Sequence, residues 1–205
     1  GNIAYDLKFH GGRYGILAEK TSPAWQFTLL DSTFDGQREA AIREHEAGLT
    51  MDNVDIRDTP VGIDIDRGYG DWLYAKNVRF ENVAKAAVVI SNEDNVYTQI
   101  AFDHATARNV PTFARFRDSG KILAGAGRAY EVTELNYGMK LDQLGAPGHF
   151  TTNYKTAALS GKSTPQRVLK ALPPTKEWAN VHTFGAKGDG RADDSFGRRA
   201  RHRGD

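Results

Sequence analysis

The chain has 205 residues, with 27 lysine and arginine residues against 26 aspartate and glutamate residues, so its formal net charge at pH 7 is +1. A charge so close to balance does not favour binding to nucleic acid or to a membrane surface. Because cysteine is absent, disulfides, cysteine-ligated metals and thiol nucleophiles are excluded, and no apolar run is long enough to cross a membrane.

One pattern of apolar and polar residues repeats about every two dozen residues between residues 3 and 117. Four of its segments begin at Trp25, Leu49, Trp72 and Tyr97. A large apolar residue occupies one position of each unit, at Phe9, Phe34, Ile56, Phe80 and Phe102. A short polar side chain stands three residues ahead of it, at Asp6, Asp31, Asn53, Asn77 and Gln99. A second apolar strand follows in each unit, at residues 15–18, 41–43, 62–65, 87–90 and 112–116.

A fixed period of this length is typical of stacked-repeat proteins. The units read as strand, turn, strand and turn without a helical period, which favours a β-solenoid over the helical solenoids. One coil cannot bury its own apolar side chains, but coils stacked about 4.8 Å apart place them in continuous interior columns. Asparagine and aspartate suit the turns because they tolerate left-handed backbone. The alternative is a β-sandwich whose strand spacing matches by coincidence.

Taken in chain order, residues 1–120 are predicted to form about five coils. Residues 37–47 have a composition compatible with a helix, but the repeat places Ala41 and Ile42 on a short strand, and we predict a strand there. The repeat fails after Gly120, and residues 121–150 are predicted to form one or two strands that close the end of the stack. Residues 151–176 read as a linker rich in threonine, serine and lysine.

A different signal runs from Trp178 to Asp194, where Phe184 is followed by Gly-Ala-Lys-Gly-Asp-Gly-Arg-Ala-Asp-Asp. It resembles the opening of pectate-lyase-superfamily β-helices, as in glycoside hydrolase family 28-related and family 55-like domains. The resemblance implies a short strand, a glycine turn and a helix capped by the second aspartate, with a structural and not a catalytic role. Residues 177–205 are therefore expected to be the stub of a second β-helix.

The tail at residues 195–205 departs from that family, because it is basic and has no helical apolar stripe. It resembles the product of a shifted reading frame or a cloning scar. A basic tail that binds nucleic acid is the alternative.

The repeats add to the resemblance. A Gly11-Gly12-Arg-Tyr-Gly15 turn, a Gln26-Phe27-Thr28 strand and a Gly62-Ile63 coil occur in the order seen in the first β-helix of family 55 glucanases and their bacterial relatives. The resemblance implies an all-β, right-handed parallel β-helix, and a truncated fragment of a two-helix enzyme. In that family the general acid lies in the second β-helix, so we expect weak or no glycosidase activity from this chain alone.

Parallel β-helices carry their chemistry on one exterior sheet, where outward side chains of successive coils form a row. Asp64 and Asp66 point outward if Ile63 and Ile65 point inward. Glycoside hydrolysis needs two carboxyl groups, about 5 Å apart for retention or about 6.5–9.5 Å apart for inversion. The candidate catalytic residues are therefore Asp64, Asp66, Glu44 and Glu93. The alternative is a solvated face whose charges neutralise one another.

Aromatic side chains stack on sugar rings, and polar ones beside them bind hydroxyl groups. The candidate substrate-binding residues are Trp25, Gln26, His45, Tyr69, Trp72, Arg115 and Arg117. The alternative for Trp25, Trp72 and Tyr97 is a ladder at one shared repeat position. No metal-ligand spacing and no nucleotide-binding motif occurs, so no metal and no cofactor are expected.

Two functions stay open at this point. The first is a fragment of a polysaccharide-degrading glycoside hydrolase, a hydrolase rather than a lyase; the second is a non-catalytic carbohydrate-binding or structural module. The expected partners are a polysaccharide or oligosaccharide and further copies of the chain, which would meet through exposed ends of the stack, with no nucleic acid and no membrane. The resemblance implies a secreted or periplasmic location.

Overall fold

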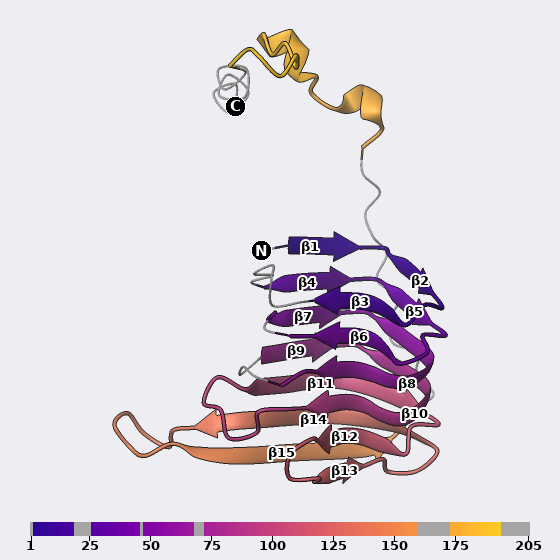
Figure 1. The fold of residues 1–205 in the computed structure, drawn as a ribbon, viewed down its shortest axis with the longest axis vertical. Coiled ribbons are helices and arrows are strands. Elements are labelled where there is room, and N and C mark those ends of the chain that lie inside the picture. Colours follow the sequence, from indigo (N-terminus) through magenta and orange to yellow (C-terminus); the bar gives the residue numbers. More distant parts are fainter. Residues whose placement is uncertain (1, 19–25, 46, 68–71, 160–172, 194–205) are drawn as a thin grey trace. The chain divides into compact units, whose positions relative to one another are not determined.

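The fold is given by a computed structural model that describes residues 2–18, 26–45, 47–67, 72–159 and 173–193. The chain divides into two compact units, residues 1–167 and residues 168–205. The first contains all fifteen strands of the described residues (Figure 1).

The strands of the first unit are short, except where one strand continues around a corner of the coil. In chain order they are β1 (Asn2–Tyr5), β2 (Lys8–His10), β3 (Tyr14–Ala18), β4 (Phe27–Leu30), β5 (Thr33–Asp35), β6 (Ala40–Glu44), β7 (Leu49–Asp52), β8 (Asp55–Ile65), β9 (Trp72–Lys76), β10 (Arg79–Ile90), β11 (Gln99–Arg108), β12 (Thr112–Phe116), β13 (Ile122–Ala124), β14 (Ala129–Lys140) and β15 (His149–Ala158).

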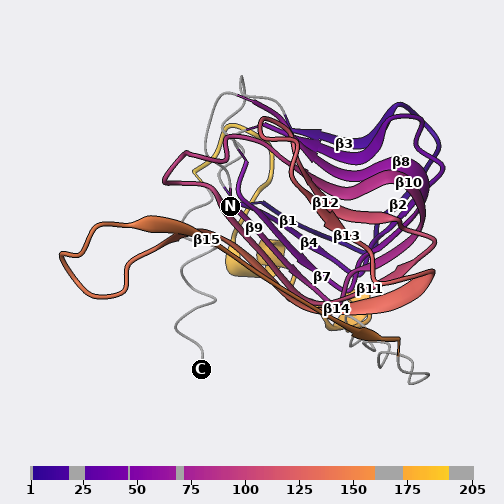
Figure 2. The same ribbon diagram turned by 90° about the horizontal axis from the view of Figure 1, so that it is seen from below.

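These strands form a parallel β-solenoid, which confirms the predicted fold class. One side of the coil is the parallel series β1, β4, β7, β9 and β11. A second side is β2, β5 and the first parts of β8 and β10, followed by the end of β11. The third side is β3, β6, the later parts of β8 and β10, and β12. Successive rungs overlie one another in the view along the stack (Figure 2).

Apolar side chains line the interior and meet their counterparts in the next coil. On the second side Phe9 lies beside Phe34, Phe34 beside Ile56, and Ile56 beside Phe80. The rings of Phe9 and Phe34 stack with their centroids 4.7 Å apart. Phe34, Ile56 and Phe80 are all buried. The predicted interior column is therefore confirmed over its first four members.

The prediction is wrong for the fifth member of this column. Ala107 lies beside Phe80, whereas Phe102 lies beside Ala75 on the first side of the coil. The rings of Phe80 and Phe102 still meet inside the solenoid, with centroids 6.2 Å apart. The cause is the step from Phe80 to Ala107, which spans 27 residues instead of the 24 between Ile56 and Phe80. The extra residues shift the whole register of β11.

The large interior rings require small neighbours on the third side. Gly62 shows this most clearly, because a Cβ at that position would lie 2.7 Å from Cε1 of Phe80. That approach is well inside van der Waals contact, so any side chain at residue 62 would displace the ring or the backbone. The Gly-Ile pair of this coil therefore serves the packing of the interior.

The corners of the coil carry the polar residues that the repeat predicted. Asp6, Asp31, Asn53 and Asn77 all have left-handed backbone, and His104 takes the fifth place where Gln99 was predicted. Amide side chains bond from coil to coil: Asn53 Nδ2 donates to Asp31 Oδ1 over 2.5 Å, and Asn77 Nδ2 donates to Asp52 Oδ1 over 3.0 Å.

A second ladder of this kind runs along the next corner. Asp58, Asn82 and Asn109 are also left-handed. Asn82 Nδ2 donates to Asp58 Oδ1 over 2.8 Å, and Asn109 Nδ2 donates to Asn82 Oδ1 over 2.9 Å. Each bond links one coil to the next, so the corners as well as the strands hold the stack together.

Strands β13 and β14 follow the last coil within residues 121–150, where one or two strands were predicted, and both run antiparallel to their partners. β13 pairs with β12, and β14 pairs with β11 along most of its length. The predicted linker is wrong for its first residues, because β15 covers residues 149–158 and pairs with β14. The later boundary between the two units, after residue 167, lies within the predicted linker. The helix rejected at residues 37–47 is absent from the described part of that segment, where β6 forms instead.

The described part of the second unit, residues 173–193, holds two short 3-10 helices, η1 (Thr175–Glu177) and η2 (Val181–Phe184). The strand that the resemblance implied before Phe184 is replaced there by η2. A strand needs a neighbour to pair with, and these residues contain none. The glycine turn is confirmed, because Gly185, Gly188 and Gly190 all have positive φ.

Asp189 organises this turn, with its Oδ1 accepting hydrogen bonds from the N–H groups of Arg191 and Ala192 at 2.9 and 2.8 Å. These two bonds hold the pKa of the Asp189 carboxyl below its usual value. The expected helix cap at Asp194 and the tail at residues 195–205 lie outside the described residues.

Candidate functional site

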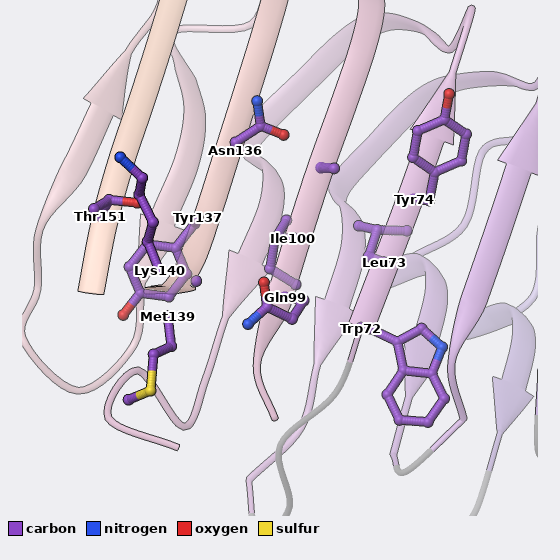
Figure 3. A pocket seen from close by; sticks show the side chains of 12 residues that line it. Trp72, Leu73, Tyr74, Gln99, Ile100, Asn136, Tyr137, Met139, Lys140 and Thr151 are labelled. Atoms are coloured by element: carbon purple, nitrogen blue, oxygen red, sulfur yellow. The ribbon is translucent and has the colours of Figure 1, made fainter. Parts of the chain in front are cut away.

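A groove on the first side of the solenoid is a candidate site, and we call it the aromatic groove. Its volume is about 280 Å³. Its lining residues come from β9, β11, β14 and β15: Trp72, Leu73, Tyr74, Gln99, Ile100, Ala101, Asn136, Tyr137, Gly138, Met139, Lys140 and Thr151. Figure 3 shows Trp72 and Tyr74 on one flank, Lys140 and Thr151 on the other, and Gln99 between them.

Strand alternation explains why two aromatic side chains face outward here. In β9, Leu73 and Ala75 are buried in the interior. Their neighbours Trp72 and Tyr74 must therefore point to the outer surface, where they are 37% and 43% exposed. The two rings stand two residues apart on one strand, which is about 7 Å along its length.

The indole of Trp72 lies over the preceding coil. Gly48 provides the space, because a Cβ at residue 48 would lie 2.6 Å from Cζ2 of Trp72. Glycine thus allows the indole to lie close against the strand surface. An indole held in this way presents an apolar face without a large loss of side-chain freedom, which suits the binding of flat apolar ligand surfaces.

The other flank carries polar side chains, and the residues on this side of the groove are well anchored. Tyr137 is buried and its hydroxyl donates to the carbonyl of Glu93; burial, aided by the nearby charges of Glu93 and Asp94, raises the pKa of this phenol. Asn136 Nδ2 donates to Glu134 Oε1 over 2.7 Å.

Gly138 leaves room for the side chain of Gln99, which packs directly against it. The groove therefore combines aromatic faces with amide groups that can exchange hydrogen bonds with hydroxyl groups.

The predicted row of charged residues lies on a different face, the outer surface of the third side. Ile63 and Ile65 are buried, and Asp64 and Asp66 project outward as predicted. Arg43 joins the two carboxylates, with Nη1 at 3.1 Å from Asp64 Oδ2 and Nη2 at 2.6 Å from Asp66 Oδ2. Arg117 also pairs with Asp64.

Ser91 fixes the position of Arg117 on this face. Its Oγ accepts a hydrogen bond from Nε of Arg117 over 2.8 Å and donates to the carbonyl of Ile65 over 2.7 Å. The row is thus a network in which each carboxylate is held by guanidinium groups, and Asp64 is only 15% exposed.

The electrostatics of Asp66 disfavour a role as a general acid. Partial burial would raise the pKa of its carboxyl, but hydrogen bonds from the N–H of Arg67 and from Arg43 outweigh burial, and the pKa is lowered. A general acid needs a raised pKa so that it carries a proton near neutral pH. Asp66 instead stays ionised throughout that range.

The two other candidate acids do not join the row. Glu44 is buried, and its Oε1 accepts a hydrogen bond from the N–H of Ala47 over 2.5 Å. Its place in β6, beside Ile65, turns it inward. Glu93 Oε1 accepts from the N–H groups of Asp118 and Ser119 at 2.9 and 3.0 Å, so it fixes the turn after β12. Both candidate acids are therefore engaged in local hydrogen bonds.

The remaining predicted binding residues are dispersed. His45 lies 4.0 Å from Asp66 and belongs to the charged row, Arg115 is exposed on the same face, and Gln26 is exposed beside the start of β4. Trp25 and Tyr69 lie outside the described residues. Tyr97 does not share a repeat position with Trp72, because Gln99 is the residue that lies beside Trp72.

Sequence reasoning found Trp72 but missed most of the aromatic groove. Tyr74 could have been found from the alternation of Trp-Leu-Tyr-Ala-Lys in β9. Asn136, Lys140 and Thr151 carry no such signal, because they reach the groove through antiparallel strands that lie outside the repeat.

Two further observations concern only the described residues. They contain no group of three histidine or acidic side chains placed to hold a metal ion. Their helices are all too short or too polar to pass through a lipid bilayer.

Comparison with known proteins gives no further guide to function: no protein-family model matches the sequence, and no curated protein matches it.

Proposed function

We propose that this chain is the glycan-binding part of a polysaccharide-degrading glycoside hydrolase, with weak or no turnover of its own. The observation that supports binding is the aromatic groove, where Trp72 and Tyr74 offer ring faces on one flank and amides lie between the flanks. Sugar rings have apolar faces and hydroxyl edges, so this pairing of aromatic and amide groups suits them.

The state of the carboxylates supports the lack of turnover. Asp64 and Asp66 are both paired with arginine, and Glu44 and Glu93 are used in local hydrogen bonds. Hydrolysis of a glycosidic bond needs one protonated and one ionised carboxyl group on either side of that bond. The proposed assignment to a hydrolase rests on the sequence resemblance, and so does the proposed secretion.

Binding can be tested by titrating neutral β-glucans, laminarin among them, while tryptophan fluorescence and calorimetric heat are recorded. We expect Trp72→Ala to weaken binding by about tenfold or more, the loss typical of a buried tryptophan contact. Gly48→Ala should weaken it as well, because the added Cβ displaces the indole. Tyr97→Ala is the matched control, since Tyr97 is exposed outside the groove, and it should change binding by less than about twofold.

Two results would oppose the proposal. Equal losses of affinity for Trp72→Ala and Tyr97→Ala would show that the glycan does not bind in the aromatic groove. Robust release of reducing sugar from laminarin or pectin, abolished by Asp64→Asn, would contradict the absence of turnover.

A further inference from the structure

A second groove lies on the outer surface of the third side, and we call it the cationic groove. Its volume is about 500 Å³. Its lining comes from the turn before β6, from β8, β10 and β12, and from the residue after β12: Arg38, Glu39, Val61, Asp64, Lys85, Ala86, Val89, Arg115 and Arg117. Four of these residues are cationic and two are acidic, so the lining carries an excess of positive charge although the whole chain is almost neutral.

The excess comes from three cations that have no ionic partner among the described residues: Arg38, Lys85 and Arg115 are exposed and take part in none of the ion pairs there. The acidic residues of the lining are already engaged. Glu39 accepts hydrogen bonds from Arg13 and Tyr14 at 2.7 and 2.6 Å, and Asp64 is shared by Arg43 and Arg117.

These three cations are spread along the stack and do not meet at one point. Arg38 precedes β6, Lys85 belongs to β10 two coils later, and Arg115 belongs to β12 one coil further. Neighbouring coils are about 4.8 Å apart, so the cations extend over roughly 10–15 Å of the stack. The arrangement suits a chain of spaced negative charges better than a single small anion.

Val61, Ala86 and Val89 lie between the cations. Ala86 and Val89 are buried, and Val61 is the partly exposed aliphatic side chain among the three. Single-stranded nucleic acid is usually bound by aromatic side chains that stack on the bases, and none of the described residues that line this groove is aromatic. The geometry therefore favours a glycan over a nucleic acid.

We propose that the cationic groove is a second binding site, for a linear glycan that carries oxyanion groups, either carboxylates or sulfate esters. The guanidinium groups of Arg38 and Arg115 can each grip such a group with two parallel N–H donors. Lys85 supplies a point charge between them. This site does not depend on the aromatic groove, which lies on another face of the coil and carries a different set of groups.

The proposal can be tested with the full chain by measuring its binding to polygalacturonate, dextran sulfate and unmodified dextran at low and high ionic strength. Removing two charge-assisted contacts, with Lys85→Ala and Arg115→Ala together, should weaken binding to the anionic polymers by about tenfold or more. The matched control is Lys8→Ala with Arg108→Ala, which removes the same net charge from exposed positions on the second side. It should change binding by less than about twofold, and Arg115→Lys, which keeps the charge but loses the paired N–H donors, should bind the anionic polymers less tightly than the original chain.

The two anionic polymers distinguish carboxylate from sulfate, and tighter binding of either supports the site and identifies the group. Binding should weaken at high ionic strength because the ion pairs are exposed. Equal losses of affinity in the two double variants would show that only the net charge of the chain matters, and this would overturn the proposal. Unmodified dextran bound as tightly as the anionic polymers would overturn it too, and so would a single-stranded oligonucleotide bound more tightly than either.

Discussion

Replacing Phe80 by alanine tests the packing on which the whole solenoid depends. Phe80 is buried, lies beside Ile56 in the interior column, and meets the edge of Phe113 with centroids 5.8 Å apart. Removing a buried phenylalanine ring costs about 3–5 kcal/mol, because transfer energy is lost and a cavity is left. A domain has a total stability of about 5–15 kcal/mol, so Phe80→Ala should remove a large share of it.

The assay is equilibrium urea unfolding followed by far-ultraviolet circular dichroism. Phe184→Ala is the control, because Phe184 is 41% exposed and lies in the second unit. It should change the free energy of unfolding by no more than about 0.5 kcal/mol. A loss below about 1 kcal/mol for Phe80→Ala would mean that the ring does not lie in a dry interior, and would refute the stacked-column reasoning.

Two further predictions concern acid stability and self-association. The pKa of the Asp66 carboxyl is lower in the folded chain than its ordinary value of 3.8, so its stabilising contribution is complete above that value and is lost as the pH falls through the lower folded pKa. Melting temperatures measured from neutral pH down to about pH 2 should therefore fall less steeply for Asp66→Asn than for the original chain, and parallel curves would contradict this. The first rung exposes Ile3 and Tyr5, which are 73% and 50% exposed, so we expect a homodimer or higher oligomer; a monomer by light scattering at high protein concentration would refute this.

The residues that line the interior of the solenoid could be predicted from the sequence, because apolar residues recur along the chain at the spacing of the strands and coils. Strand alternation around Ile63 and Ile65 was enough to place Asp64 and Asp66 on the outer face. Prediction from the repeat period failed in β11, because three extra residues moved Phe102 and Gln99 out of the positions that the period assigned to them. A repeat can be read from sequence only while its period holds. One extra residue enters at the irregularity between Val83 and Ala86 in β10, and the other two lie before β11.

The candidate sites were less accessible to prediction. Sequence spacing shows that Arg43 and Asp64 share a face, but it does not show that Arg43 and Arg117 both grip the same carboxylate. Asn136 and Lys140 approach Trp72 only because β14 turns back along β11. Such a reversal depends on the contacts of the whole chain, and no local pattern records it.

The antiparallel strands that follow the last coil also give the molecule a direction. Parallel strands form evenly spaced, slanted hydrogen bonds, whereas antiparallel strands form them in alternating narrow and wide pairs. Because β15 covers β14, a new coil arriving at this end would meet β15, which runs in the direction of the coil strands, and β13, which runs against them. A further coil could therefore pair with β13 only as an antiparallel strand, so the parallel series of the third side ends there, whereas copies that join through their first rungs would close into a pair.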